Sequence, residues 1–276
     1  MRLEKSPAMP APIILVFDSG LGGLTVFHEI AKARPDANFI YIADDAAFPY
    51  GGMPEGALIT RIVHVIGRGI ADHKPDLIVI ACNTASTLAL GELRTRFTVP
   101  FVGTVPAIKP ACAQSRSKRV AVLGTQATVS REYTRALIRE FAHGCDVKLV
   151  GSSRLAAFAE AELEGAAVAD AEIAAEIAPC FVDDGGRRTD TVVLACTHYP
   201  LLVGRFRALA PWPVAWLDPA PAIARRVTDL NGPAAGATPP APARIIFTSG
   251  KSPSPRLEKA LGGYGFSPAI AGGPAV

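Results

Sequence analysis

The chain has 276 residues, of which 49% are hydrophobic and 19% charged, and its formal net charge is +3. This composition excludes a disordered chain, and the length suits one large α/β domain or two smaller ones with a substantial core. Because the charge is small and the basic residues are scattered, apart from Arg116-Ser117-Lys118-Arg119, we expect no binding to nucleic acid.

The five cysteines are dispersed, and their number is odd. No C-x-x-C and no H-E-x-x-H spacing occurs, so we expect neither a disulfide framework nor a metal site. The longest apolar runs, such as Leu77 to Cys82, have the length of a strand and cannot span a bilayer. Residues 1–12 lack the apolar core of a signal peptide, and we expect them to form a flexible tail. We therefore expect a cytoplasmic protein that does not bind membranes.

Short apolar runs alternate with longer stretches of helical periodicity along the chain. In the N-terminal part we expect strands at 13–17, 38–43, 76–81 and 101–103, and helices at 23–33, 54–72 and 84–97. Further along we expect strands at 119–123, 146–150, 191–195, 214–217 and 244–248, and helices near 130–142, 155–164, 170–183 and 221–230. Strands that are buried on both faces and separated by helices imply parallel sheets, hence an α/β fold. We expect the Pro- and Ala-rich segment 231–243 to be an exposed loop, and the tail after Phe266 to be weakly ordered.

An internal repeat relates two of these strands. Asp76-Leu-Ile-Val-Ile-Ala-Cys82 parallels Asp190-Thr-Val-Val-Leu-Ala-Cys196, and each Cys follows its Asp by six residues. Val16-Phe17-Asp18-Ser19 and Val122-Leu123-Gly124-Thr125 form a fainter second pair. Convergent strand composition is the simpler explanation, but the matched Ala-Cys ends favour duplication. Two similar lobes would bring the carboxyl ends of their strands to a shared cleft, which is where open α/β sheets bind ligands.

Cys82 and Cys196 are the candidate catalytic residues. Each is expected at the end of a buried strand, just before a turn or helix, and a helix N-terminus would lower the pKa of a thiol there. Most buried cysteines are inert core residues, but two opposed thiols suit one particular reaction. Inverting a carbon centre requires a base on one face and an acid on the other, with the two roles exchanged in the reverse direction.

The turn Asp18-Ser19-Gly20-Leu21-Gly22-Gly23 follows the first strand and opens a helix. It departs from G-x-G-x-x-G, so a dinucleotide site is weakly indicated, although its glycines permit close approach of a carboxylate. Asp18 could accept a hydrogen bond from a substrate ammonium or orient Cys82, and His198 could polarise Cys196. We further list as candidates the neutral donors near the thiols and a turn that could close over a ligand: Asn83, Thr84, Thr197, and Pro49-Tyr50-Gly51.

These residues together resemble those of the glutamate racemases, over roughly residues 13–250. The matching motifs are Phe17-Asp18-Ser19-Gly20-Leu21-Gly22-Gly23-Leu24-Thr25, Pro49-Tyr50-Gly51, Ala81-Cys82-Asn83-Thr84-Ala85-Ser86, and Cys196-Thr197-His198-Tyr199-Pro200-Leu201-Leu202. The resemblance implies interconversion of L- and D-glutamate without pyridoxal phosphate, metal or nucleotide, and a role of D-glutamate in peptidoglycan synthesis. Members of that family are commonly dimers, so the resemblance, and nothing in the sequence itself, implies a homodimer.

The resemblance also implies an architecture and residue roles. It implies two lobes related by a pseudo-twofold axis, with residues 1–104 and 217–276 in the first lobe, 105–216 in the second, and the active site between them. Cys82 would act on D-glutamate and Cys196 on L-glutamate, with Asp18, His198 and Glu160 assisting. Glu162 and Glu164 remain alternatives to Glu160 because a small shift would exchange them. The residues implied to line the glutamate site are Asp18, Ser19, Pro49, Tyr50, Gly51, Asn83, Thr84, Thr197 and His198.

Two departures from the family pattern leave the thiols intact. Where the family usually has Asp-Thr-Ala-Arg, this chain has Asp44-Asp45-Ala46-Ala47, and where it usually has Cys-Pro, this chain has Ser152-Ser153. These changes bear on tuning and regulation of the enzyme. Three alternatives stay open: a racemase for aspartate or a related compound on the same scaffold, a non-catalytic amino-acid-binding protein, and a nucleotide-dependent enzyme that uses the glycine-rich turn.

Overall fold

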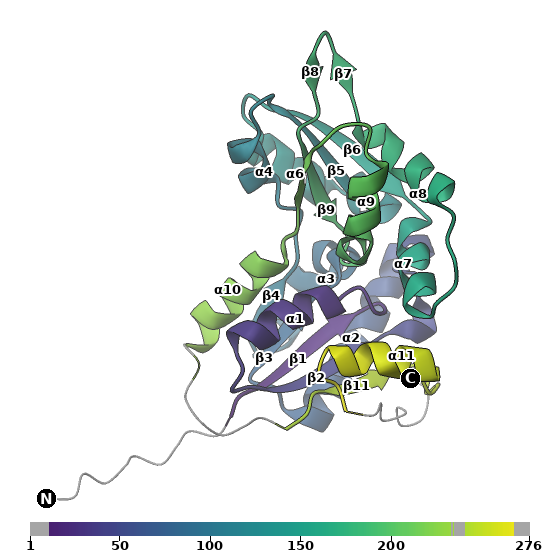
Figure 1. Ribbon diagram of the computed structural model, residues 1–276. Coiled ribbons are helices and arrows are strands. Elements are labelled where there is room, and N and C mark those ends of the chain that lie inside the picture. Colours follow the sequence, from purple (N-terminus) through teal and green to yellow (C-terminus); the bar gives the residue numbers. More distant parts are fainter. Residues whose placement is uncertain (1–10, 233, 235–240, 268–276) are drawn as a thin grey trace, which may run out of the picture.

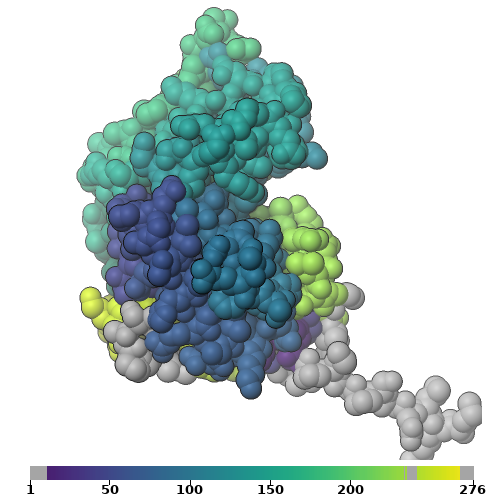
Figure 2. Space-filling view, turned by 180° about the vertical axis from the view of Figure 1, so that it is seen from behind, coloured from purple at the N-terminus to yellow at the C-terminus, as the bar shows by residue number. Residues whose placement is uncertain are grey.

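The computed structural model describes residues 11–232, 234 and 241–267. Two α/β lobes are stacked one on the other (Figures 1 and 2), each built on its own parallel sheet. The fold class expected from the sequence is therefore confirmed. The tail 1–10, most of the loop predicted at 231–243, and the tail after Ser267 lie outside the described residues.

The first sheet has the strand order β11-β2-β1-β3-β4, with all pairs parallel. Its strands are β1 (Ile13–Asp18), β2 (Asn38–Ala43), β3 (Leu77–Ile80), β4 (Phe101–Gly103) and β11 (Arg244–Phe247). These apolar runs form strands because both faces of the sheet are covered by helices, so every side chain of a central strand is buried. The strand β11, which comes from the C-terminal part of the chain, pairs with β2 and forms the edge of the sheet.

Alternate residues of β1 point to opposite faces of this sheet. Ile14 and Val16 pack against α1 (Leu24–Ala33), α10 (Ala220–Asn231) and α11 (Pro255–Gly263). Leu15 and Phe17 pack against α2 (Glu55–His73) and α3 (Asn83–Arg96) on the other face. The sheet is thus the middle layer of a three-layer lobe (Figure 1).

The second sheet has the order β10-β9-β5-β6, again parallel throughout. Its strands are β5 (Arg119–Thr125), β6 (Asp146–Ser152), β9 (Thr191–Ala195) and β10 (Ala215–Leu217). The helices α7 (Leu155–Leu163), α8 (Asp170–Ile177) and α9 (Val203–Leu209) cover one face, and α4 (Ile108–Gln114) and α6 (Glu132–Phe141) cover the other. Because Leu217 ends β10, the chain leaves this sheet one residue later than the expected boundary.

Three expectations for the second lobe were wrong in detail. The edge strand β6 alternates between exposed and covered residues and is not buried on both faces, since only β5 pairs with it. The helix expected at 130–142 begins at Glu132 as α6, and the short helix α5 (Gln126–Ser130), which was not expected, precedes it and is separated from it by the extended backbone of Arg131. The helix expected at 170–183 ends at Ile177, and a hairpin of β7 (Asp183–Asp184) and β8 (Arg187–Arg188) follows, turned by two glycines with positive φ.

The two sheets share one topology around the expected repeat. In the first, β1 lies between β2 and β3, and in the second, β5 lies between β6 and β9. The strand order therefore reverses beside β1 and beside β5, at the points where open α/β sheets form ligand crevices. The paired aspartates also act alike: Asp76 accepts a hydrogen bond from the backbone N–H of Ile13 at the start of β1, and Asp190 accepts from that of Ser117, before β5.

Within the described residues, no helix is both long and apolar enough to cross a membrane. The same part of the chain contains no group of three His, Cys, Asp or Glu side chains arranged to hold a metal ion.

Candidate active site

Both thiols line one small pocket between the lobes. Cys82 directly precedes α3 at the end of β3, and Cys196 follows β9. The strand ends are adjacent because each lies at the reversal point of its own sheet. The pocket lining is Ser19, Phe48, Pro49, Tyr50, Gly51, Cys82, Asn83, Thr84, Thr125, Ala156, Cys196, Thr197 and His198.

Cys82 caps the N-terminus of α3, where its sulfur accepts a hydrogen bond from the N–H of Ala85 at 3.5 Å. The hydrogen bond from this helix end lowers the thiol's pKa as expected, but the net shift is upward. Burial raises the pKa of Cys82 far above its usual value, and the nearby charge of Asp18 raises it further. Desolvation of a fully buried anion outweighs the hydrogen bonds that Cys82 makes with Ala85 and Ser19, so the resting side chain is a neutral thiol.

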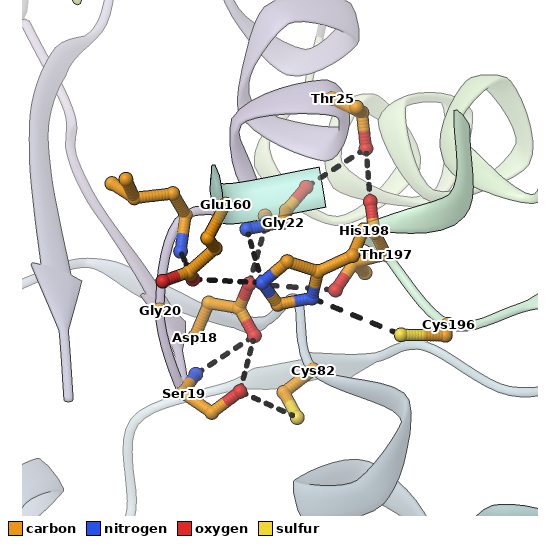
Figure 3. A network of polar contacts seen from close by, with 12 residues as sticks. Asp18, Ser19, Gly20, Gly22, Thr25, Cys82, Glu160, Cys196, Thr197 and His198 are labelled. Carbon is orange, nitrogen blue, oxygen red and sulfur yellow. Dashed lines mark hydrogen bonds and ion pairs between the residues drawn. The ribbon is translucent and has the colours of Figure 1, made fainter. Parts of the chain in front are cut away.

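Asp18 connects to Cys82 through Ser19 (Figure 3). The Cys82 thiol donates to the Ser19 hydroxyl oxygen at 3.6 Å, and that hydroxyl lies 3.4 Å from the Asp18 carboxylate as its donor. Asp18 also accepts from the backbone N–H groups of Ser19 (2.8 Å) and Gly23. Burial raises the pKa of Asp18, although His198 and these backbone donors counteract the shift.

Cys196 has a histidine as its neighbour. Nδ1 of His198 lies 3.8 Å from the Cys196 sulfur, and Nε2 lies 2.9 Å from Oε1 of Glu160. Burial alone would lower the pKa of His198, but the contacts with Cys196 and Glu160, together with the charge of Asp18, raise it well above the usual value. This shift favours the imidazolium form, whose two N–H groups face the thiol and the carboxylate (Figure 3), whereas the backbone N–H of Gly22, 3.1 Å from Nε2, is placed to donate to the neutral ring.

Of the three glutamates left open by the sequence, Glu160 is the one that reaches this site. Its Oε1 contacts His198 and accepts from the backbone N–H of Leu21 in the other lobe at 2.8 Å. Glu162 pairs instead with Arg205, and Glu164 accepts from Ser254 at 2.5 Å. Glu160 and Glu162 face different directions on α7, and Glu164 lies just beyond the end of this helix, so tertiary structure was needed to choose among them.

The neutral donors lie where the sequence placed them, around the thiols. Both polar atoms of the Asn83 amide are buried and have no hydrogen-bond partner among the described residues. The Thr84 hydroxyl lies 3.1 Å from that of Thr125, and the Thr197 hydroxyl donates to Asp18 at 3.4 Å. A buried amide without partners is unfavourable, so the Asn83 amide is available to a ligand that enters the pocket.

Sequence reasoning missed three lining residues: Phe48, Thr125 and Ala156. Thr125 had a detectable signal, because it stands at the end of β5 where the repeat places Ser19 at the end of β1. Phe48 precedes the predicted Pro49-Tyr50-Gly51 turn and lies over His198, with ring centroids 5.4 Å apart. Ala156 had no signal, since a small apolar helix residue has no chemistry that would distinguish it.

The two thiols thus have unequal surroundings. Cys82 faces a hydroxyl and a buried carboxylate, whereas Cys196 faces an imidazolium held by a second carboxylate. Thiols placed on two sides of one pocket can remove a proton from one face of a bound molecule and deliver one to the other face.

Comparison with known proteins agrees with this geometry. The sequence model of the Asp/Glu/Hydantoin racemase family matches residues 19–227. The glutamate racemase of Sinorhizobium medicae is 54% identical over 266 residues, which cover 94% of this chain and 96% of that protein. That of Brucella ovis is 58% identical over 227 residues, or 82% of each protein.

Solved structures give the same result. Escherichia coli glutamate racemase, crystallised with L-glutamate and the activator UDP-MurNAc-ala, is 38% identical, with a TM-score of 0.85 and coverage of 94% of this chain and 97% of that one. Isoform RacE1 of the Bacillus anthracis enzyme is 25% identical, with a TM-score of 0.80 over 97% of this chain and all of that one. The chain therefore belongs to the Asp/Glu/Hydantoin racemase family, and within it to the glutamate racemases.

Proposed function

We propose that this protein interconverts L- and D-glutamate, without a cofactor, by acid–base catalysis between Cys82 and Cys196. The observation that carries the proposal is that these thiols end corresponding strands of two similar sheets and line one pocket. The same proposal assigns residues 1–104 and 218–276 to one lobe and 105–217 to the other, with substrate bound between them.

In the D-to-L direction, the Cys82 thiolate removes the proton from Cα, and the Cys196 thiol delivers a proton to the opposite face. Because the resting Cys82 is a thiol, its proton must first leave, and the chain from Ser19 to Asp18 provides the acceptor. The raised pKa of Asp18 suits this role, since a carboxyl group that binds protons more readily is a stronger base.

In the L-to-D direction, the Cys196 thiolate removes the proton and the Cys82 thiol supplies one. The imidazolium of His198 stabilises the Cys196 thiolate, and Glu160 holds the ring in place from the other side. In this direction the neutral Cys82 thiol is already in the form of an acid, and Cys196 beside His198 acts as the base.

The substrate carboxylates are proposed to bind the neutral donors. The N-terminus of α3 carries Asn83 and Thr84, whose amide and hydroxyl face the pocket beside free helix N–H groups. Ser19 and Thr197 supply donors from the two lobes, and Pro49-Tyr50-Gly51 forms a wall. Asp18 and His198 border this donor set.

The test is racemisation followed by circular dichroism from each enantiomer, with incorporation of solvent deuterium at Cα and no added cofactor. We expect Cys82→Ser and Cys196→Ser each to lower turnover by about 100-fold or more in both directions, the typical contribution of an acid–base group. Cys145→Ser is the matched control, since Cys145 lies in the second lobe outside the pocket lining. A fully active Cys82→Ser or Cys196→Ser protein would refute the mechanism.

The same assay separates the alternatives. Faster loss of optical activity with aspartate than with glutamate would assign the chain to another substrate. Binding of glutamate without turnover would indicate a non-catalytic binding protein. Activity that disappears when nucleotide is stripped from the purified protein would indicate a nucleotide-dependent enzyme.

In the cell, we propose that the D-glutamate enters peptidoglycan synthesis and that the enzyme works in the cytoplasm as a homodimer. The five unpaired cysteines suit a reducing compartment. Loss of the gene should create a requirement for D-glutamate in the medium, and light scattering of the purified protein should give the mass of a dimer.

A further inference from the structure

A buried carboxylate outside the pocket lining binds several groups at once. Asp44 follows β2, is fully buried, and accepts hydrogen bonds from the Arg61 guanidinium at 2.7 Å (Nε) and 2.6 Å (Nη2). It also accepts from the hydroxyls of Tyr50 at 2.5 Å and Thr248 at 2.6 Å. Of Asp44, Arg61, Tyr50 and Thr248, only Tyr50 lines the pocket. The other three residues are therefore connected to the pocket through Tyr50.

Arg61 provides the positive charge that this carboxylate needs. It stands in the second turn of α2, and its planar group binds both oxygens of Asp44. Removing one partner of such a pair leaves an uncompensated buried charge, which is strongly unfavourable. A lysine in its place would keep the charge and lose the paired geometry, because only guanidinium presents two parallel donors.

The Tyr50 hydroxyl remains a donor in this arrangement. Burial and the adjacent Asp44 raise the pKa of Tyr50 well above its usual value, so the phenol keeps its proton and gives it to the Asp44 carboxylate as a hydrogen bond. The ring itself is buried between the sheet and the pocket, with its centroid 6.5 Å from that of Phe17. The hydrogen bond from the Tyr50 hydroxyl to Asp44 therefore links the position of the pocket wall to the position of Asp44.

The C-terminal strand holds the same segment from the other side. Thr248, just after β11, donates to Asp44 and accepts from the N–H of Ala46 at 3.3 Å. The backbone N–H of Ser249 donates to Asp45 at 2.9 Å. Asp45, which departs from the family pattern, therefore has a structural partner, and the loop after β2 is held by residues that lie 204 positions later in the chain.

We infer that Arg61 is a positioning residue for the proposed racemisation: through Asp44 and the Tyr50 hydroxyl, it holds the Pro49-Tyr50-Gly51 wall against the substrate site. The inference rests on the proposed function. The groups next to the thiols come from other elements, namely Ser19, Asp18, His198 and Glu160. Loosening the wall should therefore weaken glutamate binding more than it slows proton transfer.

The test compares Arg61→Lys with Arg68→Lys, a matched change two turns further along the same helix. We expect Arg61→Lys to raise the KM for glutamate about tenfold in both directions, as for the loss of one good hydrogen bond, with kcat within about threefold. Arg68→Lys should behave as the wild type. An unchanged KM in folded Arg61→Lys protein, or a loss confined to kcat, would overturn the inference.

A double-mutant cycle tests the route through tyrosine. Tyr50→Phe keeps the ring but removes the bond to Asp44, so it should raise KM as Arg61→Lys does. If both residues act through Asp44, the double variant should be no worse than Tyr50→Phe alone, since residues in one network are not additive. Effects on KM that multiply in the double variant would refute a shared route.

A calorimetric Kd for D-glutamate separates failure of this inference from failure of the proposed function. On a Cys82→Ser background, which holds the ligand without turnover, adding Arg61→Lys should raise Kd about tenfold. A wild type that binds glutamate but does not racemise it would refute the proposed reaction, and this Kd comparison would still decide the role of Arg61. An equal Kd with and without Arg61→Lys would refute the inference even in a fully active enzyme.

Discussion

At the residue scale, the two thiols are chemically identical and differ only in what touches them. Cys82 is next to a hydroxyl that leads to a buried carboxylate, and Cys196 is next to an imidazolium. A carboxylate disfavours a neighbouring thiolate, whereas an imidazolium favours it. Each side can still exchange protons in both directions, so the asymmetry affects the balance of the two rates and leaves the reaction class unchanged.

The raised pKa of His198 predicts a pH-dependent contribution to stability. The folded state binds the proton of His198 more tightly than the unfolded chain does, because an unfolded histidine has a pKa of about 6.5. The stabilisation is therefore complete below that pH and is lost as the pH rises through the higher folded-state value. The difference in Tm between wild type and His198→Asn should be largest in mild acid and should shrink towards alkaline pH.

His73 is the matched control for this measurement. Burial and the charge of Arg244 lower the pKa of His73, so its stabilisation is present at higher pH and is lost as the pH falls through the depressed value. The difference in Tm for His73→Asn should therefore change in the opposite sense. A difference for His198→Asn that stays constant across the pH range would contradict the imidazolium assignment.

At the element scale, the turn between β1 and α1 shows why glycine is needed next to the catalytic histidine. A Cβ built on Gly22 would lie 2.3 Å from Nδ1 of His198 and 2.6 Å from its backbone nitrogen. The latter atom belongs to the backbone and cannot simply rotate away. Gly20 and Gly22 therefore permit close packing between the lobes, since a Cβ on Gly20 would meet the Glu160 carboxylate.

Gly22→Ala should therefore displace His198 and lower kcat about tenfold or more, because small misplacements of a catalytic group have large effects on rate. Gly91→Ala is the control, since Gly91 is exposed on α3 and a Cβ there meets nothing within 4 Å. That change should leave kcat intact and slightly stabilise the helix. The racemisation rates of the two variants are measured by circular dichroism. Equal rates would show that catalysis tolerates a displaced His198, against this prediction.

The elements themselves were largely predictable from sequence. The strand at 38–43 has the predicted bounds, and β1, β3 and β9 were found because doubly covered parallel strands appear as uninterrupted apolar runs. The hairpin at 183–188 was missed because its strands are two residues long and charged, so no periodicity marks them. The short helix α5 was not predicted, and its separation from α6 at Arg131 had no signal, since arginine favours helix and its extended backbone reflects tertiary context.

At the scale of the whole molecule, the lobes meet through polar contacts around the pocket. Thr84 meets Thr125 at 3.1 Å, Glu160 reaches Leu21, and the Glu55 carboxylate pairs with Arg131. A ligand that touches both lobes therefore adds further contacts between them. The lining supplies groups from both lobes, as Asn83 and Thr197 illustrate.

Glutamate should therefore stabilise the whole molecule. At a concentration of about 100 times Kd, mass action adds about 2.7 kcal/mol to the free energy of unfolding, which corresponds to a rise in Tm of roughly 5–10 °C. D-glutamate on Cys82→Ser protein, followed by scanning calorimetry, gives this value without turnover. A rise no larger than that produced by an equal concentration of acetate would contradict binding between the lobes.

The sequence by itself determined the fold class, the repeat and the two thiols. It did so because apolar runs of strand length, spaced by helices, permit few arrangements, and because matched Ala-Cys ends mark equivalent positions in them. It also identified the neutral donors, which follow the thiols directly in the chain. Each of these features can be recognised from residues that lie close together in the chain.

Only the tertiary structure decided which distant groups act on each thiol. It chose Glu160 over Glu162 and Glu164, raised the pKa of Cys82 where a helix end alone would lower it, and joined Arg61 and Thr248 to Asp44. Burial and cross-lobe contact depend on how whole elements pack, and residues 139 apart, such as Leu21 and Glu160, have no common local signal. The energy of a charge in a protein depends on this surrounding packing, which no short stretch of sequence contains.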